Sequence, residues 1–262
     1  MNFDELLGKF QEKVRDNALL WTIILLLNAL SIVFELTSIP ATRPFSLTDI
    51  SISYPFVEAE RYDDLTLLFL SIMLPIALFG TFISLDNKNC KFHRFYEAIS
   101  GFLFGIGLSM IFTTFLKVRM AKLRPDFLAR CAPLLKKGES EIGLFTHEIC
   151  SAPFGERILN EGFKSNPSGH SSLASASMLF FSLWLYDTYG RKSHNKMISL
   201  ICFSPLFIAF DVATSRIYDF KHDYYDIYFG TIIGIVGALI GFLYIYESER
   251  DNEDTGNTIL PV

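Results

Sequence analysis

One polar stretch leads directly into a long apolar run of this sequence, Asn166-Pro167-Ser168-Gly169-His170-Ser171-Ser172. Ser168 and Gly169 keep the backbone uncrowded, so its N–H groups can approach a ligand closely. If the apolar run is helical, its unpaired first amides and positive dipole end form an anion site. His170 would then place a titratable proton beside a bound anion. The alternative is a capped turn with a histidine on the surface.

The composition indicates a polytopic membrane protein. The chain has 262 residues, of which 50% are hydrophobic and 15% aromatic, and its mean hydropathy is +0.32. These values are too apolar for an ordinary soluble domain. The net charge of −5 gives no reason to expect a nucleic-acid partner. The four cysteines show no metal-ligand spacing, and we expect neither a metal nor a cofactor.

Six apolar segments approach the length needed to cross a bilayer, which is about 20 residues for a helix. They are residues 18–36, 65–84, 96–116, 171–186, 197–213 and 227–246. We therefore expect an all-α bundle of six transmembrane helices over residues 18–246. A cytosolic lead (residues 1–17) should precede it, and a cytosolic acidic tail (residues 247–262) should follow. Pro75 is expected to kink the second span.

Basic residues in the short links orient the spans. With the N-terminus inside, and with the long polar segment 117–166 left aside, ten basic residues fall on the inner side and four on the outer side. The inner ones are Lys9, Lys13, Arg15, Lys88, Lys91, Arg94, Arg191, Lys192, Lys196 and Arg250, and the outer ones are Arg43, Arg61, Arg216 and Lys221. Both termini should therefore face the cytosol, and the polar stretch around His170 should face the lumen or the exterior.

Basic side chains stand at the end of the third span. Lys117 and Arg124 are two helical turns apart if the helix continues, and they would then share a face. Pro125 predicts that this helix ends at the two residues before it. Arginine offers a planar fork to phosphate oxygens, and lysine offers a compact point charge. The alternative is an interfacial cluster of long side chains, since Arg119 and Lys122 lie nearby.

A third polar segment precedes the last span and contains Arg216, His222 and Asp226. His222 and Asp226 are four residues apart, so on a helical turn the carboxylate can hold one ring nitrogen and leave the other with a free lone pair. An activated nucleophile or base requires this arrangement. The alternative is an acidic helix start with an incidental histidine. Ionisable groups gathered at a membrane edge are costly and usually functional.

Taken together, the three segments resemble the three-part signature of the type 2 phosphatidic acid phosphatases, also called lipid phosphate phosphatases. The matching parts are Lys117-x6-Arg124-Pro125, Pro167-Ser168-Gly169-His170 and Ser215-Arg216-x5-His222-x3-Asp226. The strings 124–131 and 166–172 are similar to those of fungal diacylglycerol pyrophosphate phosphatases in particular. Asp223 is a departure, because such relatives often carry a second histidine there. We expect its side chain to point elsewhere on the helix and at most to raise the pKa of the imidazole.

The resemblance implies a role for each residue. His222 would attack phosphorus, with Asp226 orienting it, and a phosphohistidine would form. His170 would protonate the leaving oxygen and later activate water. The phosphoryl oxygens would be held by Lys117, Arg124, Ser168, Gly169 and Arg216. Three cations spread the transition-state charge, so no metal is required. The family is also similar to vanadium haloperoxidases, but the membrane-embedded chain favours a phosphatase.

The resemblance also implies the substrate class. We expect a metal-independent hydrolase of diacylglycerol pyrophosphate, phosphatidate and lysophosphatidate that takes its substrate from the bilayer. One alternative is a phosphatase for polyisoprenyl (dolichyl) pyrophosphates or sphingoid-base phosphates. Another, less consistent with a complete catalytic set, is a catalytically silent membrane protein or lipid transporter. A vacuolar or other endomembrane location and a homo-oligomer are both compatible with the sequence.

Small residues and cysteines add three smaller expectations. The Gly-x-x-x-Gly pairs at 101/105, 230/234 and 237/241 predict close helix contacts inside the bundle, with dimerisation as the alternative. Cys131 and Cys150 share the long outer segment, where a disulfide could form in an oxidising compartment. Cys90 lies next to the membrane on the cytosolic side, and we expect a plain thiol rather than a palmitoylated one.

Overall fold

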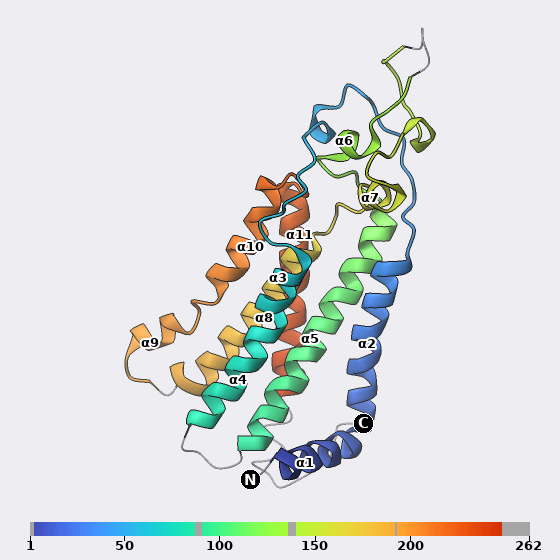
Figure 1. The fold of residues 1–262 in the computed structure, drawn as a ribbon. Coiled ribbons are helices and arrows are strands. Elements are labelled where there is room, and N and C mark those ends of the chain that lie inside the picture. Colours follow the sequence, from blue (N-terminus) through green and yellow to red (C-terminus); the bar gives the residue numbers. More distant parts are fainter. Residues whose placement is uncertain (1–2, 87–90, 136–139, 192, 248–262) are drawn as a thin grey trace.

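The structure is a bundle of long helices with an irregular cap at one end (Figure 1). This computed structural model describes residues 3–86, 91–135, 140–191 and 193–247. Within those ranges there is no strand, and β pairing is limited to two isolated bridges in the cap, Phe45 with Phe145 and Pro133 with Cys150. The all-α class is therefore confirmed. Lys88, Cys90, Lys192 and Arg250, used above for orientation and modification, lie outside the described residues.

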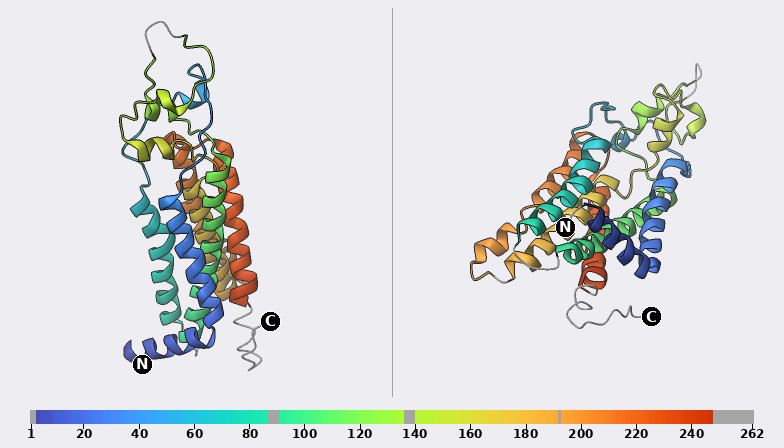
Figure 2. Two further views of the ribbon diagram at one scale, coloured as in Figure 1. Left: turned by 90° about the vertical axis from the view of Figure 1, so that its right-hand side faces the viewer. Right: turned by 60° about the horizontal axis from the view of Figure 1, so that its bottom comes forward.

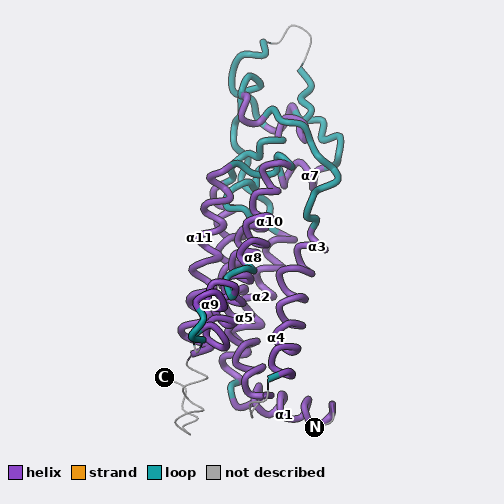
Figure 3. Tube along the Cα trace, turned by 90° about the vertical axis from the view of Figure 1, so that its left-hand side faces the viewer, coloured by secondary structure: helices purple, strands orange, loops and turns teal. Residues whose placement is uncertain are grey.

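The bundle consists of α2 (Ala18–Thr37), the continuous α3 (Asp64–Leu68), η2 (Phe69–Met73) and α4 (Leu74–Leu85), α5 (Lys91–Met120), α8 (Gly169–Leu185) with η4 (Tyr186–Gly190), α9 (Lys196–Ile201), α10 (Leu206–Tyr218), and α11 (Tyr224–Ile240) with η5 (Gly241–Tyr246). The cap contains η1 (Ile50–Ile52), α6 (Phe127–Cys131), η3 (His147–Ile149) and α7 (Glu156–Glu161). The amphipathic α1 (Phe3–Asp16) lies across the opposite end of the bundle (Figures 1 and 2). Figure 3 shows that loops are concentrated in the cap.

Five helical stretches of the described chain are long and apolar enough to cross a membrane. They are Ala18–Thr37, Asp64–Leu85, Lys91–Met120, Lys196–Tyr218 and Tyr224–Tyr246. The remaining expected span corresponds to α8, which has 17 residues and packs against α5, α10 and α11. Its buried residues include Ser171, Ser172, Ser175, Ser177 and Ser182. A helix enclosed by protein on most sides can carry these hydroxyls because neighbouring helices, rather than lipid, surround it.

Two helix boundaries differ from those expected. α5 ends at Met120 instead of continuing to Arg124, because Ala121 adopts a left-handed conformation (φ 45°) that no helix can include. The span expected over 197–213 is divided by a turn between α9 and α10. Pro205 accounts for this break, since it lacks an N–H and disfavours the helical conformation at the preceding residue. The kink expected at Pro75 stays a prediction: the wider turn of η2 ends at Met73, two residues before the proline, and the helix continues as α4.

Glycines bring α11 into backbone contact with both α8 and α5. A Cβ at Gly230 would lie 2.4 Å from the carbonyl oxygen of Ser168 at the start of α8. A Cβ at Gly105 of α5 would lie 2.7 Å from the carbonyl oxygen of Gly237 on α11. Only hydrogen fits at such positions. The glycine pairs therefore serve packing inside the bundle, as expected.

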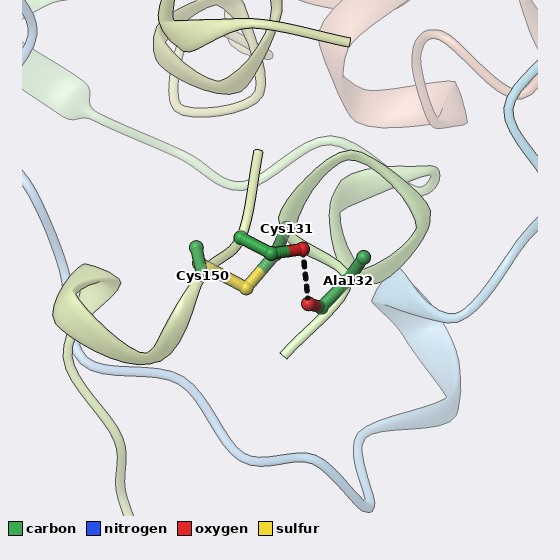
Figure 4. The surroundings of a disulfide bond; sticks show 4 residues. Cys131, Ala132 and Cys150 are labelled. Atoms are coloured by element: carbon green, nitrogen blue, oxygen red, sulfur yellow. Dashed lines mark hydrogen bonds between the residues drawn. A yellow bond between two sulfur atoms is a disulfide. The ribbon is translucent and has the colours of Figure 1, made fainter. Parts of the chain in front are cut away.

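The cap has a small core of its own and a covalent tie. Phe127 contacts Phe45 and Phe163 edge-on, with ring centroids 4.8 Å apart in both cases. A disulfide joins Cys131 at the end of α6 to Cys150 just after η3 (Figure 4). The disulfide that the sequence allows but does not decide is therefore present. It holds α6 and the 150–162 segment together above the open end of the bundle.

Candidate active site

A polar cavity of about 740 Å³ lies where the bundle meets the cap. Its walls come from the ends of α2, α5 and α10, the starts of α3 and α8, the cap helices α6 and α7, and the loop before α11. Of the eight residues predicted from the sequence, six line it: Lys117, Arg124, Gly169, His170, Arg216 and His222. The other two, Ser168 and Asp226, have no exposed surface and lie directly behind the wall. The structure thus brings all eight to one place.

The start of α8 forms part of the wall of this cavity. Ser168 is the N-cap, and its Oγ accepts from the backbone N–H of Ser171 (3.4 Å). A Cβ at Gly169 would lie 3.1 Å from Nζ of Lys117, so the absence of a side chain lets the ammonium approach the helix start. The free amides of the first turn and the lysine charge therefore act on the same small volume.

His170 is held by the loop that enters α3. Its Nε2 lies 3.0 Å from the carbonyl oxygen of Tyr62 and 4.0 Å from Oδ1 of Asp64. A carbonyl can only accept, so Nε2 carries the hydrogen of this bond and Nδ1 is the acceptor nitrogen of the neutral ring. The ring is buried against the cavity wall and lines the cavity from the α8 side.

His222 lies in the loop before α11, not on a helical turn with Asp226 as predicted. Its Nδ1 is nevertheless 3.7 Å from Oδ2 of Asp226, slightly longer than a hydrogen bond. Burial lowers the pKa of His222 to about 3, Arg124 and Arg216 act in the same direction, and Asp226 opposes them. The expected rise of the imidazole pKa is therefore wrong. The ring is neutral at physiological pH and has a lone pair available for attack.

Asp226 is fixed by donors from several directions. Its Oδ1 accepts from Nζ of Lys122 (2.9 Å), and its Oδ2 accepts from Oγ of Ser165 (2.5 Å) and from the backbone N–H of Asp223 (3.1 Å). The N–H of Asp226 donates in turn to Oδ1 of Asp223 (3.0 Å), which completes a capping box. Asp223 is thus the N-cap of α11 and pairs with Lys122, and the predicted position on the helix itself is wrong.

Arg124 reaches the cavity by another route than the one predicted. Because α5 ends at Met120, Arg124 lies outside this helix, and Lys117 and Arg124 do not share a helix face. The backbone N–H of Arg124 donates to the carbonyl oxygen of Gly162 (2.8 Å), just after α7. The guanidinium therefore enters from the cap side while Lys117 enters from α5. The predicted geometry is wrong, but both cations line the cavity.

Each of the three predicted phosphate-binding cations is paired with a carboxylate that sequence reasoning missed. The pairs are Lys117–Glu35 (3.1 Å), Arg124–Glu161 (3.3 Å) and Arg216–Glu60 (2.8 Å). Nε of Arg124 and Nε of Arg216 are buried and have no hydrogen-bond partner in the described structure. Leaving a buried charged donor unpaired is costly, so both guanidinium groups favour an acceptor oxygen in the cavity.

The two carboxylates outside the helices of the bundle are ionised. Burial raises the pKa of Glu161, but Arg124 and other nearby cations outweigh it and hold this pKa below its usual value. The pKa of Glu60 is lowered in the same way, with burial opposed chiefly by Arg216. Of the three carboxylates, only Glu35 gives a sequence signal, because it interrupts an apolar span. Glu60 and Glu161 lie in polar segments where no spacing distinguishes them.

The arrangement suits nucleophilic attack on a tetrahedral oxyanion. A neutral imidazole faces three cations and a helix start, with a buried carboxylate behind it. Such a set stabilises charge that develops on equatorial oxygens during phosphoryl transfer. Within the described residues, no group of three or more His, Cys, Asp or Glu side chains is placed to hold a metal ion.

Comparisons with known proteins match most of the chain. The model of the PAP2 superfamily matches residues 98–250. The "Probable diacylglycerol pyrophosphate phosphatase 1" of Schizosaccharomyces pombe is 33% identical over 217 residues, which cover 82% of this chain and 73% of that protein. The "Diacylglycerol pyrophosphate phosphatase 1" of Saccharomyces cerevisiae is 31% identical over 205 residues, covering 76% and 69%. The "Phospholipid phosphatase 1" of Rattus norvegicus is 29% identical over 237 residues, covering 84% and 83%. No solved structure matches the chain.

Proposed function

Because this chain belongs to the PAP2 superfamily, we propose that it is an integral membrane hydrolase that removes phosphate from lipid phosphates and lipid pyrophosphates without a metal ion. One observation carries the proposal: the cavity combines a neutral, buried His222, the fixed carboxylate of Asp226 and three cations. Each of these groups has a distinct role in phosphoryl transfer.

The reaction proceeds in two displacements at phosphorus. Nδ1 of His222 faces Asp226, so Nε2 is the nitrogen that attacks, and a P–N bond forms as the P–O bond to the lipid breaks. Nδ1 of His170 takes up the proton that a monoanionic phosphate ester brings with it, and His170 gives that proton to the leaving lipid oxygen. Water then attacks the phosphohistidine while His170 takes a proton from it, the P–N bond breaks, and inorganic phosphate is released. Asp226 orients the His222 ring throughout.

The remaining predicted residues bind the phosphoryl oxygens. Lys117, Arg124 and Arg216 supply positive charge, and the helix start at Ser168 and Gly169 supplies backbone amides. These donors are held in place before the substrate arrives, so little reorganisation accompanies the transition state.

We infer that the substrates are diacylglycerol pyrophosphate, phosphatidate and lysophosphatidate. Two fungal relatives, each about a third identical to this chain, carry the name diacylglycerol pyrophosphate phosphatase, which favours this set. Polyisoprenyl pyrophosphates and sphingoid-base phosphates are the alternative, since the same cavity chemistry would serve them. A phospholipid in the bilayer is thus the partner we propose, with no nucleic acid and with a homo-oligomer compatible.

We further infer six spans, with α8 as the sixth, both termini in the cytosol, and the cavity on the lumenal or outer face. In support, α1 and the end of η5 lie at the end of the bundle opposite the cap (Figure 2). The disulfide of the cap suits an oxidising compartment, such as the lumen of the vacuole or another endomembrane. Residues 18–246 would form the phosphatase domain between the cytosolic lead and tail.

A substrate panel tests the function. Purified protein in detergent micelles with excess EDTA should release inorganic phosphate from diacylglycerol pyrophosphate and phosphatidate at the rate seen with Mg²⁺. Activity that disappears with EDTA and returns only with Mg²⁺ would contradict the metal-free mechanism. Preference for a polyisoprenyl pyrophosphate over every glycerolipid would establish the alternative substrate class.

Site-specific labelling tests the orientation. A cysteine placed at Ser140 in the cap should react with a membrane-impermeant maleimide only from the lumenal or outer face of sealed vesicles. Labelling from the cytosolic face would reverse the proposed orientation. A cysteine placed at Asp16, at the end of α1, should show the opposite accessibility.

A further inference from the structure

The cations of the cavity are paired with carboxylates of the chain itself. Glu161 bridges two of them, with Oε2 3.3 Å from Arg124 and Oε1 3.0 Å from Nζ of Lys164. Glu60 does the same, with Oε2 2.8 Å from Arg216 and Oε1 3.4 Å from Nζ of Lys221. A carboxylate that uses both oxygens on two cations resembles one face of a phosphoryl group.

The carboxylates are more exposed than the cations with which they pair. The side chains of Lys117, Arg124 and Arg216 are 8%, 10% and 2% exposed, whereas those of Glu35, Glu60 and Glu161 are 32%, 25% and 27% exposed. The three glutamates also come from separate elements: the end of α2, the loop before α3, and α7. Each can therefore rotate away without disturbing the other two.

Phosphoryl oxygens and these carboxylates compete for the same positive charge. A phosphate dianion that contacts all three cations would bring its charge close to the carboxylates paired with them, including the ionised Glu60 and Glu161, and like charges at that distance repel strongly. One cavity can hold one set of anions or the other. Oε2 of Glu35 is buried without a hydrogen-bond partner, so Glu35 is held on this side by its bond from Lys117 to Oε1 (3.1 Å).

We propose that Glu35, Glu60 and Glu161 are built-in counter-ions, which release Lys117, Arg124 and Arg216 to the incoming phosphoryl group and reclaim them to expel inorganic phosphate. This inference rests on the proposed function, because it assigns these cations to phosphate. Without such competitors, the clustered cations would retain the product, and release would limit turnover.

A purely structural role makes the opposite prediction. If the glutamates only hold the cations in position, removing one carboxylate misplaces its cation and weakens phosphate binding. If they compete, removing one carboxylate strengthens phosphate binding. The sign of the change in the phosphate dissociation constant therefore separates the two roles.

The experiment is equilibrium binding of inorganic phosphate to the purified full chain in micelles, measured by calorimetry. Glu161→Gln, Glu60→Gln and Glu35→Gln should each lower the Kd for phosphate by about tenfold, which corresponds to a hydrogen bond to a charged group. Product inhibition by phosphate should tighten by the same factor, and kcat should fall while KM for the lipid also falls. An unchanged or higher Kd in the variants would overturn the proposal.

Glu58→Gln is the matched control. Glu58 lines the same cavity, is exposed, and makes no ion pair in the described structure. Its replacement removes one negative charge without releasing a cation, so the Kd for phosphate should change by less than about twofold. An effect as large as that of Glu161→Gln would show that net charge alone explains the result, and would equally overturn the proposal.

Two further measurements keep the outcome unambiguous. Glu161→Asp retains the charge but shortens its reach, so its Kd should fall between those of the native chain and Glu161→Gln; a Kd outside that range contradicts competition. Thermal unfolding identifies any variant that has lost its fold, and the remaining variants then decide. Phosphate binding can be measured without turnover. A chain that binds phosphate but hydrolyses no lipid phosphate would refute the proposed function. The phosphate Kd of the glutamate variants would still show whether the carboxylates compete with phosphate.

Discussion

Asp226 and Glu161 are both carboxylates that face positive charge near the cavity, but they are held in opposite ways. Asp226 has no exposed surface and accepts hydrogen bonds from Lys122, Ser165 and the backbone of Asp223. The side chain of Glu161 is 27% exposed, and its described partners are two cations that reach it from the cavity wall. Asp226 is therefore part of the buried framework of the protein, whereas Glu161 lies at the solvent-accessible surface of the cavity.

The difference matches what the proposed reaction would require of each carboxylate. Orienting a nucleophile needs a group that stays in place, because a small rotation of His222 misdirects its lone pair. Binding and releasing an anion needs positive charge that can be offered and withdrawn. Enclosing the first carboxylate in helix starts and leaving the second on the short cap helix α7 meets both requirements in one cavity.

The largest expected effect is the loss of activity when either cavity histidine, His222 or His170, is replaced. His222→Ala should abolish turnover and any trapped phosphoenzyme, because the nucleophile is lost. His170→Ala should still become phosphorylated by a substrate with a good leaving group and should then stall, since water is no longer activated. Both should lower kcat by about 10³-fold or more. Radiolabelled phosphate retained by His222→Ala but absent from His170→Ala would reverse the assignment.

Asp226→Asn tests whether the buried carboxylate acts through His222. We expect kcat to fall by about 10²-fold while phosphoenzyme still forms, because orientation is lost and the nucleophile remains. Asp223→Asn is the control, since asparagine also caps helices well. If both variants lose activity equally, then Asp226 acts by stabilising the start of α11, and its distinction from Glu161 disappears.

Ser165→Ala removes one of the hydrogen bonds that hold the carboxylate of Asp226 but leaves the carboxylate itself in place. Asp226 would lose its 2.5 Å hydrogen bond from Ser165, and we expect kcat to fall by about tenfold with KM for the lipid nearly unchanged. Ser177→Ala is the control, because Ser177 is also buried but its Oγ has no partner in the described structure. A rise in KM with constant kcat would indicate that Ser165 serves substrate binding instead.

The smallest expected effect is a pH dependence of stability. Burial lowers the pKa of His222 from 6.5 to about 3, so the unfolded chain binds more protons between these values. The stability contributed by neutral His222 is complete above about pH 6.5 and is lost as the pH falls toward 3. The melting temperature of the native protein should therefore fall between pH 7 and pH 5. His222→Asn should show a shallower slope over that window; an equal slope would mean that His222 does not remain neutral when folded.

Patterns local in sequence were enough for the helical architecture and for the residues that converge on the cavity. Apolar length identifies helices such as α2 and α11, and the three-part signature identifies residues as distant as Lys117 and Asp226. The packing role of the glycine pairs could also be predicted, whereas the sequence left the disulfide open. In each case the informative residues are close together in the chain, or the resemblance joins them.

Features that depend on the backbone path between segments could not be predicted. The seven-residue spacing of Lys117 and Arg124 predicts a shared helix face, but the left-handed Ala121 ends the helix first. Nothing in the local sequence reveals that Glu60 and Glu161 face those cations, because their positions follow from how the cap folds over the bundle. The sequence pattern places Lys122 only in an interfacial cluster, whereas in the structure it donates a hydrogen bond to Asp226.

The close packing of α11 against α8 limits which substitutions this protein can accept during evolution. Gly230 leaves room only for hydrogen against the carbonyl of Ser168, whose own N–H donates to the carbonyl of Asp226 (2.9 Å). The gap between the two histidine-bearing segments is thus set by main chain against main chain. Lipid-facing side chains of the bundle can be exchanged over generations without altering that gap. At position 230 itself, every substitution adds at least one carbon atom. Mutations that replace this glycine should therefore be removed by selection.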